Sequence, residues 1–199
     1  MSLVLIDLDN IQEIRKVRPV NIDTVKIRAH HCTRAIVEDI KDNGLKIFDL
    51  GERLEYLKKN LLSYGISAQL IEKYEKEVRE YISGMQLKGR REKICFCLNR
   101  ELFEVDNGCD DFFKYFGGEA MYRIADCDSQ FSLIQEALKF IGEPLVVTAS
   151  ISLRTAQSYQ KDRIEQRING QLTENCEVFI HENVPPEDIL QIEVFNKDI

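Results

Sequence analysis

Apolar residues recur along this chain with two different periods, and each change of period marks a change of predicted element. Between residues 52 and 83 they follow helical spacing in two stripes, Leu54, Leu57 and Leu61, then Ile71, Tyr74, Val78 and Ile82. Charged residues occupy the opposite positions, as on helices that pack one face against a core. Gly65 separates the stripes, so this segment is predicted to form two helices.

Short apolar runs predict strands elsewhere in the chain. They lie at residues 3 to 6, 25 to 31, 94 to 98, 145 to 153 and 175 to 180. The polar half of the run at 145 to 153 alternates, which is typical of a half-exposed strand. Helices are predicted at 129 to 141, with Asp128 as N-cap, and at 155 to 169, and a polar turn at 106 to 111. Together these elements predict a mixed α+β fold.

The segment around His31 carries the first candidate chemistry. A strand from residue 25 to His31 is followed by a polar turn with Thr33, and then by a short helix with Ile36, Val37 and Ile40 on one face. Thr33 is the expected N-cap of this helix, and Gly44 is its expected C-cap glycine. An imidazole and a hydroxyl would then lie at a strand end, near the positive end of a helix. Such a place suits a polar or anionic ligand.

His31-x-Thr33, followed by a short helix that ends in Ile40-x-x-x-Gly44-Leu45, resembles the opening motif of the ADP-ribosyltransferase fold. The resemblance implies that His31 binds the ribose and carboxamide side of NAD, and that Thr33 braces it. It also implies a split central β-sheet, with residues 1 to 199 as a single domain and 52 to 83 as a helical insertion. A buried histidine at a strand end is the alternative interpretation.

The C-terminal forty residues carry the second part of the resemblance. Glu177-Val-x-Ile180 is followed by Val184-Pro-Pro and by a closing strand, as at the end of ADP-ribosyltransferase domains and related DNA-modifying toxins. Glu177 matches the catalytic glutamate of that pattern. Asn175 stands two residues before it, so the Glu-x-Glu of arginine-modifying enzymes is absent, and the resemblance does not imply arginine as the acceptor.

Cleavage of the glycosidic bond of NAD builds positive charge on the ribose, and a nearby carboxylate stabilises that charge. The resemblance therefore implies that Glu177 is catalytic and that His31 and Glu177 flank one bound ribose. It also implies an aromatic ring that stacks on nicotinamide, and Tyr115 and Tyr122 are both candidates beside Gly117-Gly118.

Three functions are consistent with this resemblance. The first is transfer of ADP-ribose from NAD to a macromolecule, protein or nucleic acid, by a bacterial toxin or defence effector. The second is an NAD-dependent RNA 2′-phosphotransferase, and the third is a non-catalytic ADP-ribosyltransferase-like module that binds a protein or nucleotide. The formal net charge of −7 disfavours the second, because gripping RNA phosphates requires basic residues.

Length and composition restrict the class of protein further. The 199 residues suffice for one domain with its own core, no apolar run is long enough to span a bilayer, and the N-terminal segment lacks a basic region. We therefore expect a cytoplasmic protein without a membrane partner. The six cysteines are Cys32, Cys95, Cys97, Cys109, Cys127 and Cys176, with no Cys-x-x-Cys spacing. Reduced, metal-free thiols are the expectation.

Overall fold

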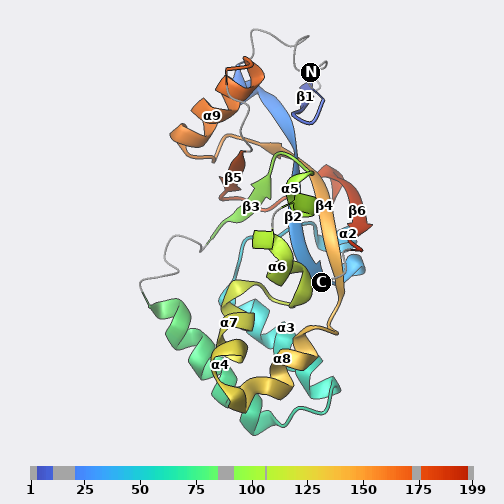
Figure 1. Cartoon of the computed structure of the whole chain (residues 1–199), viewed down its shortest axis with the longest axis vertical. Coiled ribbons are helices and arrows are strands. Elements are labelled where there is room, and N and C mark those ends of the chain that lie inside the picture. Colours follow the sequence, from blue (N-terminus) through green and yellow to red (C-terminus); the bar gives the residue numbers. More distant parts are fainter. Residues whose placement is uncertain (1–3, 11–20, 85–91, 106, 172–175, 197–199) are drawn as a thin grey trace.

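The computed structural model describes residues 4–10, 21–84, 92–105, 107–171 and 176–196. Figure 1 shows a twisted sheet in the upper part of the molecule and a group of helices below it. The predicted mixed α+β class is confirmed. Among the described helices, none combines the length and the apolar character that crossing a membrane requires.

The sheet has six strands, which are β1 Val4–Asp7, β2 Val25–Ala35, β3 Ile94–Cys97, β4 Glu143–Ser152, β5 Glu177–Ile180 and β6 Ile189–Val194. The order β5-β3-β2-β4-β6 is antiparallel throughout, and β1 pairs with β2 in parallel. β4 occupies one edge of β2 from Lys26 to Ala35. β1 and β3 therefore share the other edge of β2, β1 beside residues 25 to 28 and β3 beside His30.

The helices fall into a longer and a shorter group. The longer α-helices are α2 Val37–Asn43, α3 Leu50–Ser63, α4 Ala68–Ser83, α7 Glu119–Cys127, α8 Ser132–Leu138 and α9 Ser158–Ile168. Short helical segments are η1 Ile22–Thr24, α5 Leu102–Val105, η3 Asn107–Cys109, α6 Asp110–Lys114, η4 Ser129–Phe131 and η5 Pro186–Asp188. The helices α3, α4, α7 and α8 form the lower part of the molecule in Figure 1, which we call the helical lobe.

β2 is longer than predicted, and this changes the local geometry of the His31 segment. The predicted strand end at His31 and the predicted N-cap at Thr33 are both wrong, because β2 continues to Ala35 and Ile36 is the N-cap residue of α2. Pairing with β4 satisfies the backbone as far as Ala35, and these ladder bonds outweigh an early helix start. Gly44 is the C-cap of α2 as predicted, with φ of +69°.

The sheet has two covered faces. On one, which we call the α9 face, Ile27 and Ala29 of β2 pack with Ile164 of α9 in the main hydrophobic core. On the other, which we call the α6 face, Cys97 and Val146 pack with Phe113 of α6. Because both faces are covered, the polar half of β4 is buried rather than half-exposed as predicted, and Thr148 is only 1% exposed.

The helical lobe has a hydrophobic core of its own. The two predicted stripes are buried there, which confirms the two helices between residues 52 and 83. They pack against α7 and α8, which follow β3 in the sequence, so the lobe is built from segments on both sides of β3. Tyr74 is fully buried in this core, and its hydroxyl donates to the carbonyl oxygen of Met121 at 2.5 Å.

Two further sequence predictions differ in detail. The polar turn expected at 106 to 111 is helical where the structure describes it, as η3 and the start of α6. Asp128 does cap the next helical segment, through a bond from the backbone N–H of Gln130, but that segment is η4 and continues as α8. At both places the chain forms a short 3-10 segment, where the sequence had predicted a turn in the first case and a continuous α-helix in the second.

Candidate functional site

The five residues predicted for the site fall in three places. His31 and Thr33 lie on β2, and Glu177 begins β5. Tyr115 and Tyr122 stack on each other in the helical lobe, with ring centroids 5.5 Å apart, and both are buried. The structure thus brings His31 together with Thr33, and Tyr115 together with Tyr122, but it does not gather all five residues around one hollow.

The strand register places His31 and Glu177 on opposite faces of the sheet. Glu177 pairs with Cys97, and Cys97 pairs with His30, so these three side chains point to the α6 face. His31 is the next residue of β2 and points to the α9 face, opposite Val147 of the main core. The expectation that His31 and Glu177 flank one ribose therefore disagrees with this register.

His31 has a fixed tautomer. Its Nδ1 lies 2.9 Å from the carbonyl oxygen of Cys95, and a carbonyl oxygen only accepts, so Nδ1 carries the proton. Burial lowers the pKa of His31, and the Arg53 charge lowers it further although the Cys95 carbonyl opposes this. The ring is thus neutral near pH 7. Among the described residues Nε2 has no hydrogen-bond partner, so it presents an acceptor lone pair.

The sequence analysis did not single out two residues of α3 that the structure relates to His31, Arg53 by its charge and Tyr56 through the ring that both contact. The charge of Arg53 on α3 lowers the pKa of His31, and its guanidinium lies over the ring of Phe116, 5.8 Å from the ring centroid. Tyr56, one turn further along α3, stacks on the same ring and hydrogen-bonds Asp39. Burial and this bond raise the pKa of Tyr56 to about 12. The available sequence signal was Arg53 and Tyr56 at helical spacing beside the leucine stripe.

On the α6 face, His30 rather than His31 joins a polar network. Its Nε2 donates to Oδ2 of Asp9 at 3.2 Å, and its Nδ1 lies 2.9 Å from Oγ1 of Thr148. Asp9 also accepts from the side chain of Asn99 and from the backbone N–H of Arg100. Burial alone would raise the pKa of Asp9, but these hydrogen bonds together lower it.

Thr148, His30 and Asp9 lie in the order of a catalytic nucleophile, base and acid. The burial of Thr148 and His30 indicates that the network is structural. Thr148 is 1% exposed and His30 is 3% exposed, so a substrate cannot reach the hydroxyl. Asp9 instead ties the segment after β1 to β2 and to the end of β3. The apolar run followed by Asp7 and Asp9 was the sequence signal for it.

Glu177 lines a separate hollow of about 240 Å³ at the edge of the sheet. Its side chain is exposed, and the other lining residues are Leu102, Tyr159, Gln160, Arg163 and Phe179. The backbone N–H of Phe179 donates to Oε1 of Gln160 at 3.4 Å, which fixes α9 against β5. A carboxylate is thus available to solvent here, away from His31. Asn175, two residues earlier, lies outside the described residues.

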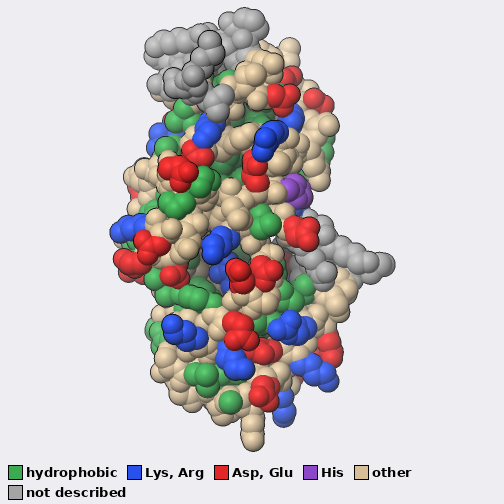
Figure 2. All heavy atoms as spheres, turned by 180° about the vertical axis from the view of Figure 1, so that it is seen from behind, with side chains coloured by type: hydrophobic (Ala, Val, Ile, Leu, Met, Phe, Trp, Pro, Cys, Tyr) green, Lys and Arg blue, Asp and Glu red, His purple; other side chains and the backbone are tan. Residues whose placement is uncertain are grey.

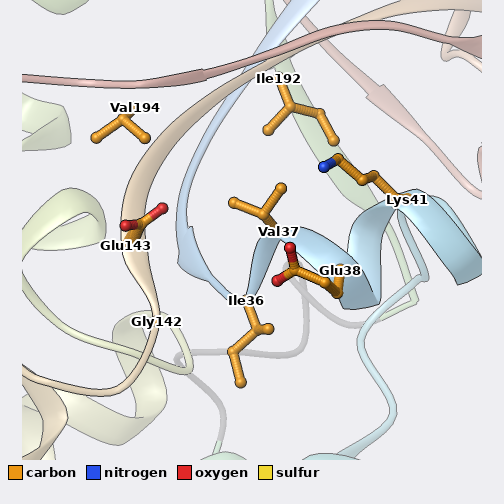
Figure 3. A pocket seen from close by; sticks show the side chains of 8 residues that line it. All are labelled: Ile36, Val37, Glu38, Lys41, Gly142, Glu143, Ile192 and Val194. Carbon is orange, nitrogen blue, oxygen red and sulfur yellow. The ribbon is translucent and has the colours of Figure 1, made fainter.

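A larger hollow of about 490 Å³ lies between α2 and the β4–β6 edge (Figure 3). Glu38, Lys41 and Glu143 supply its charges, and apolar side chains such as Val37 and Ile192 supply the rest. None of the five predicted residues lines it. Size alone therefore does not select the functional site in this molecule.

Three of the six cysteines meet on the α6 face. Cys32 and Cys109 pack against Cys97, and Cys109 hydrogen-bonds both of the others. These bonds, followed by burial, raise the pKa of Cys32 and of Cys97. Within the part of the chain that the structure describes, no group of His, Cys, Asp or Glu side chains is arranged to hold a metal ion.

Comparison with protein-family models, with curated proteins and with solved structures finds no match to this chain. The likeness to ADP-ribosyltransferases therefore depends on the motifs around His31 and Glu177.

Proposed function

We propose that this protein binds NAD on the α9 face of its sheet, with the neutral Nε2 of His31 accepting a hydrogen bond from a ribose hydroxyl. The observation that carries the proposal is the Nδ1 bond of His31 to the Cys95 carbonyl, which leaves Nε2 as an acceptor. A ribose hydroxyl is a donor that such an acceptor can use. Thr33 lies two residues further on the same face of β2 and braces the site.

The arrangement of β1 and β3 supports an ADP-ribosyltransferase-type split sheet as part of the same proposal. These two strands share one edge of β2, so the sheet is interrupted between them beside Arg28 and His30. The helices α3 and α4 then take the place of the proposed helical insertion.

Transfer of ADP-ribose from NAD to a macromolecule, protein or nucleic acid, is the reaction we propose for this site. It requires a carboxylate beside the ribose. Glu177 is the residue that the family resemblance supplies, but its side chain points to the α6 face. Asp39 is a carboxylate whose charge acts on Arg53, and the charge of Arg53 in turn acts on His31. We therefore propose Asp39 as the stabilising carboxylate, and Glu177 as its competitor for that role.

A titration of the purified protein with NAD tests the binding proposal. His31→Phe keeps a ring against Phe96 but removes the acceptor, and we expect NAD affinity to fall about tenfold, the loss that follows when one hydrogen bond of about 1.4 kcal/mol is removed. His181→Phe is a matched control, because His181 makes the same Nδ1 bond to a carbonyl, that of Glu92. Wild-type protein that binds neither NAD nor ADP-ribose would overturn the proposal.

A further inference from the structure

Arg53 of α3 is a charged residue whose surroundings differ from those of an ordinary surface arginine. Its side chain is only partly exposed, and its charge lowers the pKa of His31. Across the described ranges, its guanidinium makes neither an ion pair nor a hydrogen bond, and its close neighbour is the ring of Phe116. Five N–H donors are thus held in place without an acceptor.

Such a group is unfavourable unless something neutralises it. Burial lowers the pKa of Arg53, and the electrostatic effects of Tyr56, Asp39 and Glu52 raise it only in part. A desolvated guanidinium normally has a carboxylate or a phosphate as partner. His31 faces it as a neutral ring, so His31 adds no repulsion that would keep an anion away.

We propose that Arg53 is an anion-binding residue that takes the diphosphate of a nucleotide. The planar fork of a guanidinium matches two phosphate oxygens at once, and the Phe116 ring below it restricts its orientation. Figure 2 shows that the back of the molecule is hollowed at mid-height and that Lys or Arg side chains lie in the hollow, so basic groups are accessible there.

The neighbouring His31 selects among anions. Its Nε2 is an acceptor, so it favours a ligand with a hydroxyl close to the phosphate, and a nucleotide sugar has both groups. A simple carboxylate or sulfate would satisfy Arg53 alone. This inference deepens the proposed function and rests on it only for the identity of the nucleotide as NAD.

The experiment uses inorganic pyrophosphate and NAD as separate probes, each titrated by calorimetry into the full chain. We expect Arg53→Gln to lower the affinity for both probes at least tenfold, and Arg53→Lys to lower it less, because the charge stays but the fork is lost. Arg79→Gln is the matched control, since Arg79 is exposed on α4, and it should bind both probes as the wild type does. Circular dichroism verifies that each variant is folded.

The melting temperature without ligand provides a second measurement. Removal of an unpaired, desolvated charge should leave the melting temperature of Arg53→Gln equal to that of the wild type or higher. If Arg53 were structural, the variant would melt lower and bind pyrophosphate unchanged, and this result would overturn the inference. If pyrophosphate binding depends on Arg53 and NAD does not bind, Arg53 is an anion-binding residue but NAD is not the ligand. If NAD binds equally to wild type and Arg53→Gln, NAD is a ligand but Arg53 does not bind its diphosphate.

Discussion

His31 and Glu177 point to opposite faces of one sheet, with β3 between their strands. Motifs at the two ends of the chain therefore do not meet around one ligand, although each lies on a strand of the same sheet. The histidine that shares a face with Glu177 is His30, and it is occupied by Asp9 and Thr148. His31, by contrast, presents a free acceptor on the side of Arg53.

The first prediction separates the two candidate carboxylates. We expect Asp39→Asn to lower the rate of nicotinamide release from NAD by roughly 100-fold, which is typical when one preorganised electrostatic group is lost. Glu177→Gln should leave NAD affinity within about twofold of wild type, because the sheet separates it from His31. Nicotinamide release and NAD titration on both variants check this. A large loss of release in Glu177→Gln alone would return the catalytic role to Glu177.

The second prediction concerns pH. Folding lowers the pKa of His31 below its ordinary value of 6.5, so the unfolded chain takes up the proton first as pH falls. The contribution of neutral His31 to the free energy of unfolding is therefore complete above about pH 6.5, and it declines at lower pH. NAD affinity should be flat from about pH 7 to 8.5, and should fall in acid as Nε2 loses its lone pair. Titrations across this range test it, and His31→Phe should not show the acid loss.

The third prediction concerns Asp9. Its carboxylate accepts from His30, Asn99 and Arg100, so Asp9→Asn should lower the free energy of unfolding by about 1–3 kcal/mol at pH 7. The pKa of Asp9 is lowered by folding, so its contribution is present above 3.8 and is lost as pH falls through the lower folded value. Urea unfolding at pH 7 and near pH 3 should show the difference shrinking. Asp162→Asn, at an exposed position of α9, is the control.

The fourth prediction concerns the core of the helical lobe. Leu57 is fully buried there, so Leu57→Ala should lower the free energy of unfolding by about 2–5 kcal/mol. Tyr74→Phe removes only the bond to the carbonyl of Met121 and should lower it by about 1 kcal/mol. Denaturant unfolding of both variants gives these values. Equal losses would contradict this, because they would show that the hydroxyl of Tyr74 contributes as much as the packing of Leu57.

The fifth prediction concerns the cysteines. A thiol-alkylating reagent should modify the exposed Cys95 and Cys127 first, and the buried Cys97 and Cys176 only on unfolding. The hydrogen bond to Cys109, followed by burial, raises the pKa of Cys97, so its reactive thiolate is scarce. Mass spectrometry of timed samples gives the order. The expectation of reduced, metal-free thiols is checked on the same preparation, and bound zinc in elemental analysis would contradict it.

Local sequence patterns were sufficient for most elements of the fold. The leucine stripe of α3 and the stripe of α4 were buried as their spacing indicated, and Gly44 ended α2 as a glycine with positive φ does. These features depend on residues within a few positions of one another. The end of β2 did not, because it was set by pairing with β4, more than a hundred residues away.

In the candidate site, too, some features follow from the local sequence and others only from the tertiary structure. Alternation along a strand means that the adjacent His30 and His31 must face opposite sides, and the sequence determined that much. Which of them shares a face with Glu177 depended on the register of β2 with β3 and of β3 with β5. A shift of one residue in either register would exchange the faces. Arg53 came close to His31 only through the packing of α3 below the sheet, because contacts between distant segments are fixed by tertiary structure and not by local spacing.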